Sequence, residues 1–146
     1  MPANVYTHAK VLLAQDRLRW SVGTEVFRAL LVGAGYVYNS AHRYVSDVLS
    51  AEVSGGTYAR VDVTGRVVNA DYLGDRALLD ADNVVFPALS GVLPAGLIIY
   101  RRVGTNDATP GDDPLVCHLG FGLTTTTGQP FMIEFHADGV VGISTC

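Results

Sequence analysis

Charge is scarce in this chain, and lysine is almost absent. Charged residues make up 16% of its 146 residues, and Lys10 stands alone beside nine arginines. An average globular chain carries about 25% charge, so the deficit favours a surface that neighbouring subunits cover, although a bias towards Ala, Val and Gly would look the same. The formal net charge is −4 and there is no basic run. We therefore predict no direct binding to nucleic acid.

Cysteines and long apolar runs are equally few. Cys117 lies in an apolar stretch and Cys146 ends the chain. A bridge between them is possible, but folding requires no disulfide or metal, and Cys146 could instead stay free or pair between subunits. No apolar run approaches the roughly 18 to 20 residues of a membrane span, and residues 1–4 lack the basic start of a signal peptide. We expect neither membrane association nor secretion.

Motifs for catalysis and cofactor binding are missing as well. The chain has no Gly-x-Ser-x-Gly elbow, and the apolar setting of Cys117 disfavours a thiolate. Residues 33–35 and 120–122 lack the third glycine and following helix of a dinucleotide site. Glu134 and Asp138 form the only local pair of carboxylates suited to glycan or peptide cleavage. We predict no catalytic residue, no cofactor and no enzyme.

Three sets of residues carry side chains that can ligate a metal ion but lack the spacing of a known metal site. His118, Glu134 and His136 lack a fourth ligand at zinc spacing. The acidic segment 80–83 lacks the glycine and glutamate of a calcium loop. Aspartates in the segment 104–114 could hold a cation, which stays a minor alternative because flexible oxygen-rich loops do bind calcium. We predict no metal.

Apolar and polar residues alternate along most of the chain, and turn-rich segments recur roughly every ten residues. This pattern predicts a mainly β protein. We expect a single domain over residues 1–146, an antiparallel β-sandwich or barrel-like fold with one or two short helices. A domain of this length buries roughly two-thirds of its unfolded surface, enough for an ordinary core.

The alternation also predicts individual elements. Residues 5–13 fit either a short helix or a strand, and residues 40–50 fit a short helix. The most apolar run, 97–103, is expected at the centre of a sheet, and 104–114 is expected to be a loop facing solvent or a partner. Strands 115–121 and 131–136 are expected to pair as a hairpin. The other predicted strands are 17–22, 25–32, 58–63, 66–70, 76–81, 84–89 and 140–144.

Arginines and tyrosines provide candidate contacts with other subunits. Arginine favours bidentate pairing at interfaces, and exposed tyrosines act there as amphipathic anchors. Ordinary surface arginines and tyrosines that fill β corners are the alternative. The candidate interface residues are Tyr36, Tyr38, Tyr44, Tyr58, Arg60, Arg101, Arg102, Asp107, Asp112 and Asp113.

The stretch 36–66 has a recognisable layout: an apolar strand, a polar turn with Ser46 and Asp47, a Gly55-Gly56-Thr57-Tyr58 corner and an alternating strand. Asp80-Ala81-Asp82-Asn83-Val84, an Ile-Ile-Tyr strand, an Asp/Pro/Gly loop and Phe131-Met132-Ile133-Glu134-Phe135 follow. In this order of elements the chain resembles a family of small virion structural proteins of tailed bacteriophages. It departs from that family at residues 17–22, where an acidic stretch is more usual.

The resemblance implies a non-enzymatic virion component. It would be a minor capsid or decoration protein, made in the host cytoplasm and located on the capsid surface, where it binds and stabilises the major capsid protein as a homo-oligomer, with a trimer favoured. The alternative is a tail, baseplate or fibre-associated module that binds a host receptor or glycan. In that case the segments 104–114 and 124–128 would carry the contacts.

Overall fold

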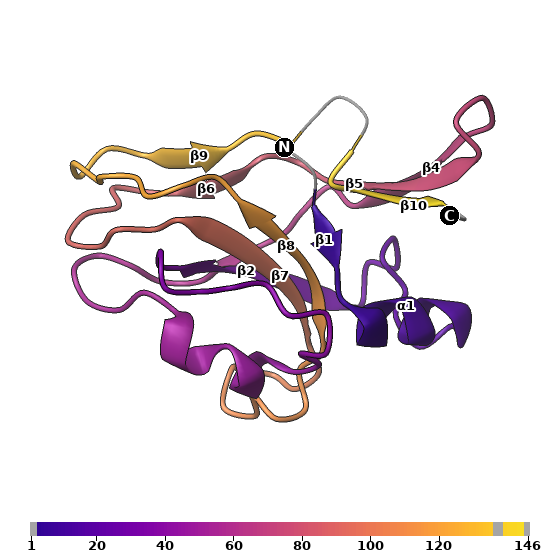
Figure 1. The fold of residues 1–146 in the computed structure, drawn as a ribbon, viewed down its shortest axis with the longest axis horizontal. Helices are drawn as coiled ribbons and strands as arrows, with labels where there is room; N and C mark the ends of the chain where they lie inside the picture. Colours follow the sequence, from indigo (N-terminus) through magenta and orange to yellow (C-terminus); the bar gives the residue numbers. More distant parts are fainter. Residues whose placement is uncertain (1–2, 136–138, 145–146) are drawn as a thin grey trace.

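The computed structural model describes residues 3–135 and 139–144 and contains a five-stranded antiparallel sheet (Figure 1). Its strand order is β1-β8-β7-β2-β3. The bounds are β1 Asn4–Val5, β8 Leu115–Gly120, β7 Gly96–Arg102, β2 Val26–Val32 and β3 Val61–Asp62. Successive residues of β7 and β2 are buried, as expected for strands covered on both faces. The prediction that 97–103 forms a central strand is confirmed.

Two smaller sheets complete the β structure. β6 (Val84–Phe86) pairs with β9 (Phe131–Ile133), and β5 (Arg76–Asp80) lies between β10 (Val141–Ser144) and β4 (Val67–Asp71). In Figure 1, β6 and β9 lie above the five-stranded sheet, and the β4–β5 hairpin projects from the body. The small β-rich domain is confirmed, while the choice between sandwich and barrel stays a prediction.

Helical structure is confined to short pieces. Residues 5–13 divide between β1 and helix α1, Thr7–Ala14. The predicted helix 40–50 is present only as two 3-10 turns, η1 (Val45–Asp47) and η2 (Leu49–Ala51). The Asp47 carboxylate accepts the backbone N–H groups of Arg43 (2.8 Å) and Tyr44 (3.1 Å), and these hydrogen bonds lower the pKa of Asp47. No described helix is long and apolar enough to cross a membrane.

The prediction of a strand at 17–22 is wrong. The alternation is real, since Leu18 and Trp20 are buried, but the backbone there bonds to side chains and within local turns instead of to a neighbouring strand. The Trp20 carbonyl accepts a hydrogen bond from Arg66 at 2.5 Å, and Arg19 N–H donates to Glu25 at 3.2 Å. Alternation indicates which side chains point inwards and does not by itself establish a strand partner.

The expected 115–121/131–136 hairpin is also wrong. β8 pairs with β7 and β1, whereas β9 pairs with β6. The connection between β8 and β9 passes from one sheet to another, where Phe121 and Phe131 lie with their ring centroids 5.7 Å apart. The inward-facing apolar residues of 115–121 and 131–136 were compatible with pairing of these two segments. Period-two alternation, however, does not identify which strand lies next to which.

The glycine corner between η2 and β3 behaves as expected. Gly56 has φ +57°, and a Cβ atom there would lie 1.9 Å from the Ser90 carbonyl oxygen. Thr57 Oγ1 donates to the Ala88 carbonyl at 2.6 Å. The corner therefore needs glycine both for its backbone conformation and for close packing.

Candidate functional site

Three of the predicted interface residues, Tyr58, Arg60 and Asp107, meet in one polar network beside β2 and β7. Arg60 donates to both carboxylate oxygens of Glu52 at 2.8 Å, and the Tyr58 hydroxyl donates to Glu52 at 2.5 Å. Tyr100 accepts from Arg60 at 3.1 Å and donates to Asp107 at 2.7 Å. Arg28 also pairs with Asp107. We call this set the polar clamp; it comprises Arg28, Glu52, Tyr58, Arg60, Tyr100 and Asp107.

The polar clamp is largely buried, so its hydrogen bonds are shielded from water. The Arg60 and Glu52 side chains are each only 13% exposed. The hydrogen bonds with Glu52 raise the pKa of Arg60, and burial raises the pKa of Tyr58 and Tyr100. The arginine therefore stays charged and the two phenols stay protonated donors at neutral pH. Tyr58 and Arg60 point into the clamp, so only Val61–Asp62 of the predicted strand 58–63 forms β structure.

The loop 104–114 is held against the body at its second half. Val45 N–H donates to the Asp113 carbonyl at 2.9 Å, and Ser46 N–H donates to the Pro110 carbonyl at 3.0 Å. The Asp113 side chain is fully buried: one oxygen accepts Val103 N–H at 3.0 Å, and burial raises the pKa of this carboxyl. The expectation that this loop faces only solvent or a partner is therefore wrong for Asp107 and Asp113.

Tyr36 and Tyr38 belong to an aromatic cluster. Tyr36 and Tyr6 share a hydrogen bond of 2.7 Å, and Tyr38 donates to the Val5 carbonyl at 2.9 Å. The ring centroids of His118 and Tyr36 lie 5.1 Å apart. Burial lowers the pKa of His118. Four of the tyrosines taken as exposed, at positions 36, 38, 44 and 58, are half-buried. That expectation is wrong because residues of the same chain cover their rings.

The metal and nucleophile candidates are not brought together. His118 lies on β8 and Glu134 follows β9, and these strands do not pair; His136 and Asp138 lie outside the described residues. Within 3–135 and 139–144, no group of three His, Cys, Asp or Glu side chains could hold a metal ion. Burial raises the pKa of Cys117 to about 12, so this thiol is protonated at neutral pH.

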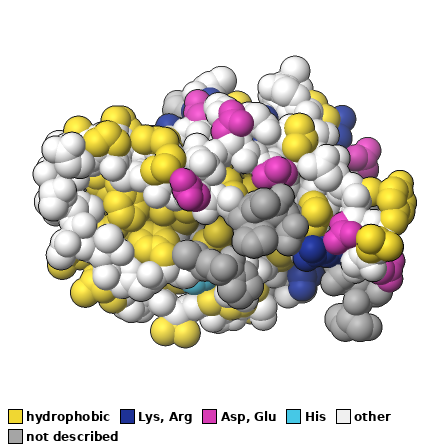
Figure 2. Space-filling model, turned by 90° about the horizontal axis from the view of Figure 1, so that it is seen from above, with side chains coloured by type: hydrophobic (Ala, Val, Ile, Leu, Met, Phe, Trp, Pro, Cys, Tyr) yellow, Lys and Arg dark blue, Asp and Glu magenta, His cyan; other side chains and the backbone are white. Residues whose placement is uncertain are grey.

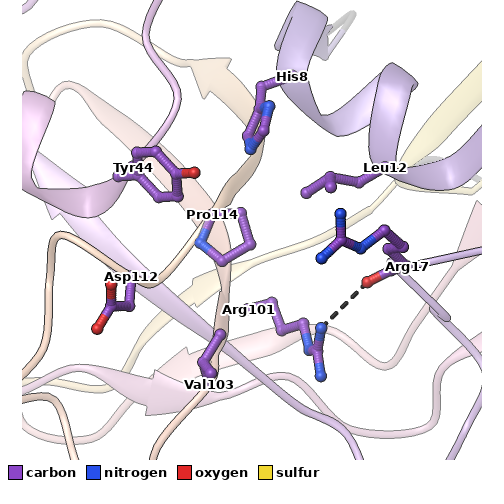
Figure 3. A pocket seen from close by; sticks show the side chains of 8 residues that line it. All are labelled: His8, Leu12, Arg17, Tyr44, Arg101, Val103, Asp112 and Pro114. Atoms are coloured by element: carbon purple, nitrogen blue, oxygen red, sulfur yellow. Dashed lines mark hydrogen bonds between the residues drawn. The ribbon is translucent and has the colours of Figure 1, made fainter. Parts of the chain in front are cut away.

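A pocket of about 280 Å³ lies between α1, the end of β7 and the loop 104–114 (Figure 3). Three predicted interface residues, Tyr44, Arg101 and Asp112, line it. Figure 3 shows Tyr44 and Asp112 on one side and the two arginines, Arg17 and Arg101, on the other. The remaining lining residues are His8, Leu12, Val103 and Pro114.

The two arginines of the pocket differ in their partners. Arg101 donates to the Arg17 carbonyl at 3.1 Å and lies 3.4 Å from the buried Glu25 carboxylate. The Arg17 guanidinium pairs with no carboxylate among the described residues, and its residue is exposed. Burial, followed by the charges of Arg43 and Arg17, lowers the pKa of His8. The pocket thus offers an unpaired cation beside apolar walls.

Arg102, the remaining predicted interface residue, lies outside the pocket lining. Its Nε donates to the Gly104 carbonyl at 3.2 Å, where the loop begins.

The β4–β5 hairpin, residues 67–80, exposes large apolar side chains, and we call it the arm. Val67 and Val68 are 45% and 49% exposed, while Tyr72 and Leu73 at its tip are 92% and 103% exposed. The tip is nonetheless ordered by hydrogen bonds, since Asp71 accepts from Gly74 N–H at 2.9 Å and Arg76 Nε at 2.8 Å. Among the residues that the structure describes, β4 pairs with β5 alone, and no described strand lies along its other edge.

A second apolar surface lies on the β6–β9 sheet. Val85 and Met132 are cross-strand partners that face outwards, 42% and 51% exposed. Leu93 and Leu123, in loops, are also exposed. Figure 2 looks onto this side of the molecule and shows hydrophobic side chains gathered there. We call Val85, Leu93, Leu123 and Met132 the apolar patch.

Sequence reasoning missed Leu73 at the arm tip and the apolar patch. The available signals were local: an apolar Tyr72-Leu73 pair between aspartates in a turn, and apolar residues at outward positions of two short strands. No family model, no curated protein and no solved structure matches this chain.

Proposed function

We propose that this chain is a non-enzymatic structural protein of a tailed-phage virion, a minor capsid or decoration protein that binds and stabilises the shell of major capsid protein as a homo-oligomer. The observation that carries the proposal is the exposure of large apolar side chains on the arm and on the apolar patch. Both occur in a chain with few charges, whose polar clamp residues already have internal partners.

Apolar exposure of this kind supports assembly on physical grounds. Contiguous apolar surface is uncommon on solvated monomers and marks sites that other molecules cover. Stable protein interfaces bury about 1,600 Å² in total, and repetition over many copies multiplies a modest contact into firm attachment. Attachment of this type would reinforce a shell against the outward pressure of packaged DNA.

A tail, baseplate or fibre module that binds a receptor or glycan is the second candidate. Its contacts would come from loops, and the residues 122–130 include exposed leucine, threonine and glutamine side chains that suit such a role. The loop 104–114 suits it less, because Asp107 and Asp113 point into the chain. Copy number in the virion separates the two candidates: a number comparable to that of the major capsid protein indicates the shell, and a far smaller number indicates the tail.

Co-sedimentation with expanded, empty shells of the phage that encodes the chain tests the proposal. We expect saturable binding that Met132→Glu weakens, because it places a charge in the apolar patch. Val37→Glu is the matched control, since Val37 is 79% exposed and lies outside both the arm and the patch. Absence of shell binding, or turnover on a panel of ester, glycan and phosphate substrates, would contradict the proposal.

A further inference from the structure

The arm tip has the form of a knob. Tyr72 and Leu73 are almost completely exposed, so they contact little in their own chain. Asp71 fixes the turn through its hydrogen bonds to Gly74 and Arg76, which limits the entropy that binding would cost. Asp75 follows with φ +52°, and its carboxylate has no hydrogen-bond or ion-pair partner among the described residues. The tip therefore presents two apolar side chains beside a free negative charge.

The pocket has the complementary composition. Leu12, Val103 and Pro114 provide apolar walls, and Arg17 provides a free positive charge in a chain whose formal net charge is negative. Its volume of about 280 Å³ lies just below the roughly 300 to 1,000 Å³ range of small-molecule pockets. A pocket of this size is suited to one or two side chains of a protein partner.

We propose that the arm tip of one copy of this chain occupies the pocket of a neighbouring copy. Leu73 would pack against Leu12 and Val103, and Asp75 would pair with Arg17. This inference rests on the proposed function and deepens it, because it identifies the contact that holds the homo-oligomer together.

The proposed contact joins different surfaces of two identical copies. Such a heterologous contact closes into a ring if the rotation between copies allows it, and otherwise propagates as a filament. The Tyr72 hydroxyl has a role in the same arrangement, since Asp112 lies across the pocket from the arginines (Figure 3) and can accept its hydrogen bond. Leu73 and Asp75 bring an apolar and a charged side chain to the apolar and cationic lining residues of the pocket.

A charge exchange tests the contact in the full chain, with sedimentation velocity at several protein concentrations as the readout. We expect the wild type to form a defined oligomer. Arg17→Glu and Asp75→Arg should each weaken association by about tenfold or more, because each places like charges at the contact. The double variant, R17E with D75R, should restore association, since the two reversed charges attract again.

Two controls keep the test decisive. Lys10→Glu reverses an exposed cation of α1 that does not line the pocket, and it should leave association unchanged. Thermal unfolding followed by circular dichroism verifies that each variant is folded. A wild type that stays monomeric at all concentrations, or a folded double variant that does not regain association, would overturn the inference.

Shell binding distinguishes this inference from the proposed function. If the charge exchange fails while the wild type binds empty shells, the arm–pocket contact is wrong and the function stands. If the exchange succeeds and shells are not bound, the contact stands and the capsid role is wrong.

Discussion

The polar clamp and the arm differ in how far their side chains are covered by the chain itself. The clamp gathers charges that the sequence suggests are available to partners, and its side chains satisfy one another: Arg60 bonds both oxygens of Glu52, and Tyr100 links Arg60 to Asp107. The arm carries apolar side chains that are left exposed, and Tyr72 and Leu73 are the most exposed of them. Polarity in the sequence therefore did not indicate which side chains have partners within the chain and which are left exposed.

A more useful criterion for an interaction surface is whether its polar groups already have hydrogen-bond partners and its apolar side chains are already buried. A buried charge with complete hydrogen bonding has little to gain from a partner, whereas an exposed leucine gains free energy from every contact that removes it from water. On this criterion we propose the arm, the pocket and the apolar patch as interaction surfaces, whereas the clamp braces the loop 104–114 from within the chain.

The largest effect should come from breaking the polar clamp. Arg60→Ala leaves the buried Glu52 carboxylate without its cation, whereas Asp107 keeps Arg28. Breaking a buried pair costs about 3–5 kcal/mol in the free energy of unfolding. Urea unfolding measures this loss. Arg102→Ala is the control: it removes one exposed hydrogen bond to Gly104, and we expect a change of about 0.5 kcal/mol or less, the size of an ordinary surface substitution. Equal losses in the two variants would show that the clamp is not an internal brace.

A smaller loss in the free energy of unfolding is expected when Arg66, at the base of the arm, is replaced. Arg66 donates to the carbonyls of Trp20 and Glu25, each at 2.5 Å, and its guanidinium lies 4.5 Å from the Phe27 ring centroid. Arg66→Ala should cost about 1.5–3 kcal/mol, the range for hydrogen bonds to a charged group. Urea unfolding with the wild type as reference measures it. A change under about 0.5 kcal/mol, the size of an ordinary surface substitution, would mean that the arm base is not anchored by this side chain.

Two aspartates, Asp113 in the loop 104–114 and Asp47 beside it, should contribute to stability with opposite dependences on pH. The raised pKa of Asp113 means that the folded state keeps a proton that the unfolded state releases, so its contribution to stability falls as pH rises from about 3.9, the unfolded value. The lowered pKa of Asp47 means the reverse: its contribution is present above about 3.9 and is lost as pH falls through the folded value.

Unfolding free energies from pH 2 to pH 7, measured for Asp113→Asn and Asp47→Asn, would show these signs. Relative to the wild type, D113N should become more stable as pH rises above about 4, and D47N should become less stable as pH rises towards about 4 from the acid side. Curves that run parallel to that of the wild type for both variants would contradict the assigned directions.

The smallest effect on stability is expected at the arm tip. Leu73→Ser alters a side chain that is fully exposed in the single chain, and the free energy of unfolding of the dilute, monomeric protein should change by no more than about 0.5 kcal/mol. Thermal unfolding at low concentration measures this. Val68→Ser, at 49% exposure, is the matched control in the same arm. A large loss for Leu73→Ser alone would mean that the tip already packs within its own chain.

The strong patterns in the sequence predicted the β class and its central strand, because the run 97–103 is apolar enough to need cover on both faces. Turn chemistry also predicted well: Pro87 follows the last residue of β6, and Gly55-Gly56 marks a sharp corner. These features depend on local conformation and burial, which individual residues determine directly.

Pairing and side-chain partners were not predictable in the same way. Nothing in the alternation of 115–121 and 131–136 indicates that these strands join different sheets. Arg60 and Asp107 lie far apart along the chain, so their meeting depends on the fold. The tyrosines at positions 36 and 58 are half-buried for the same reason, since the groups that cover them come from distant segments.

Amide hydrogen exchange below and above the concentration at which the wild type assembles tests the central claim most directly, because it compares both regions in one experiment. The account predicts added protection in residues 67–75 of the arm and in residues 8–17 beside the pocket, with no change at 104–110. Added protection confined to 104–110, with the arm unchanged, would contradict it.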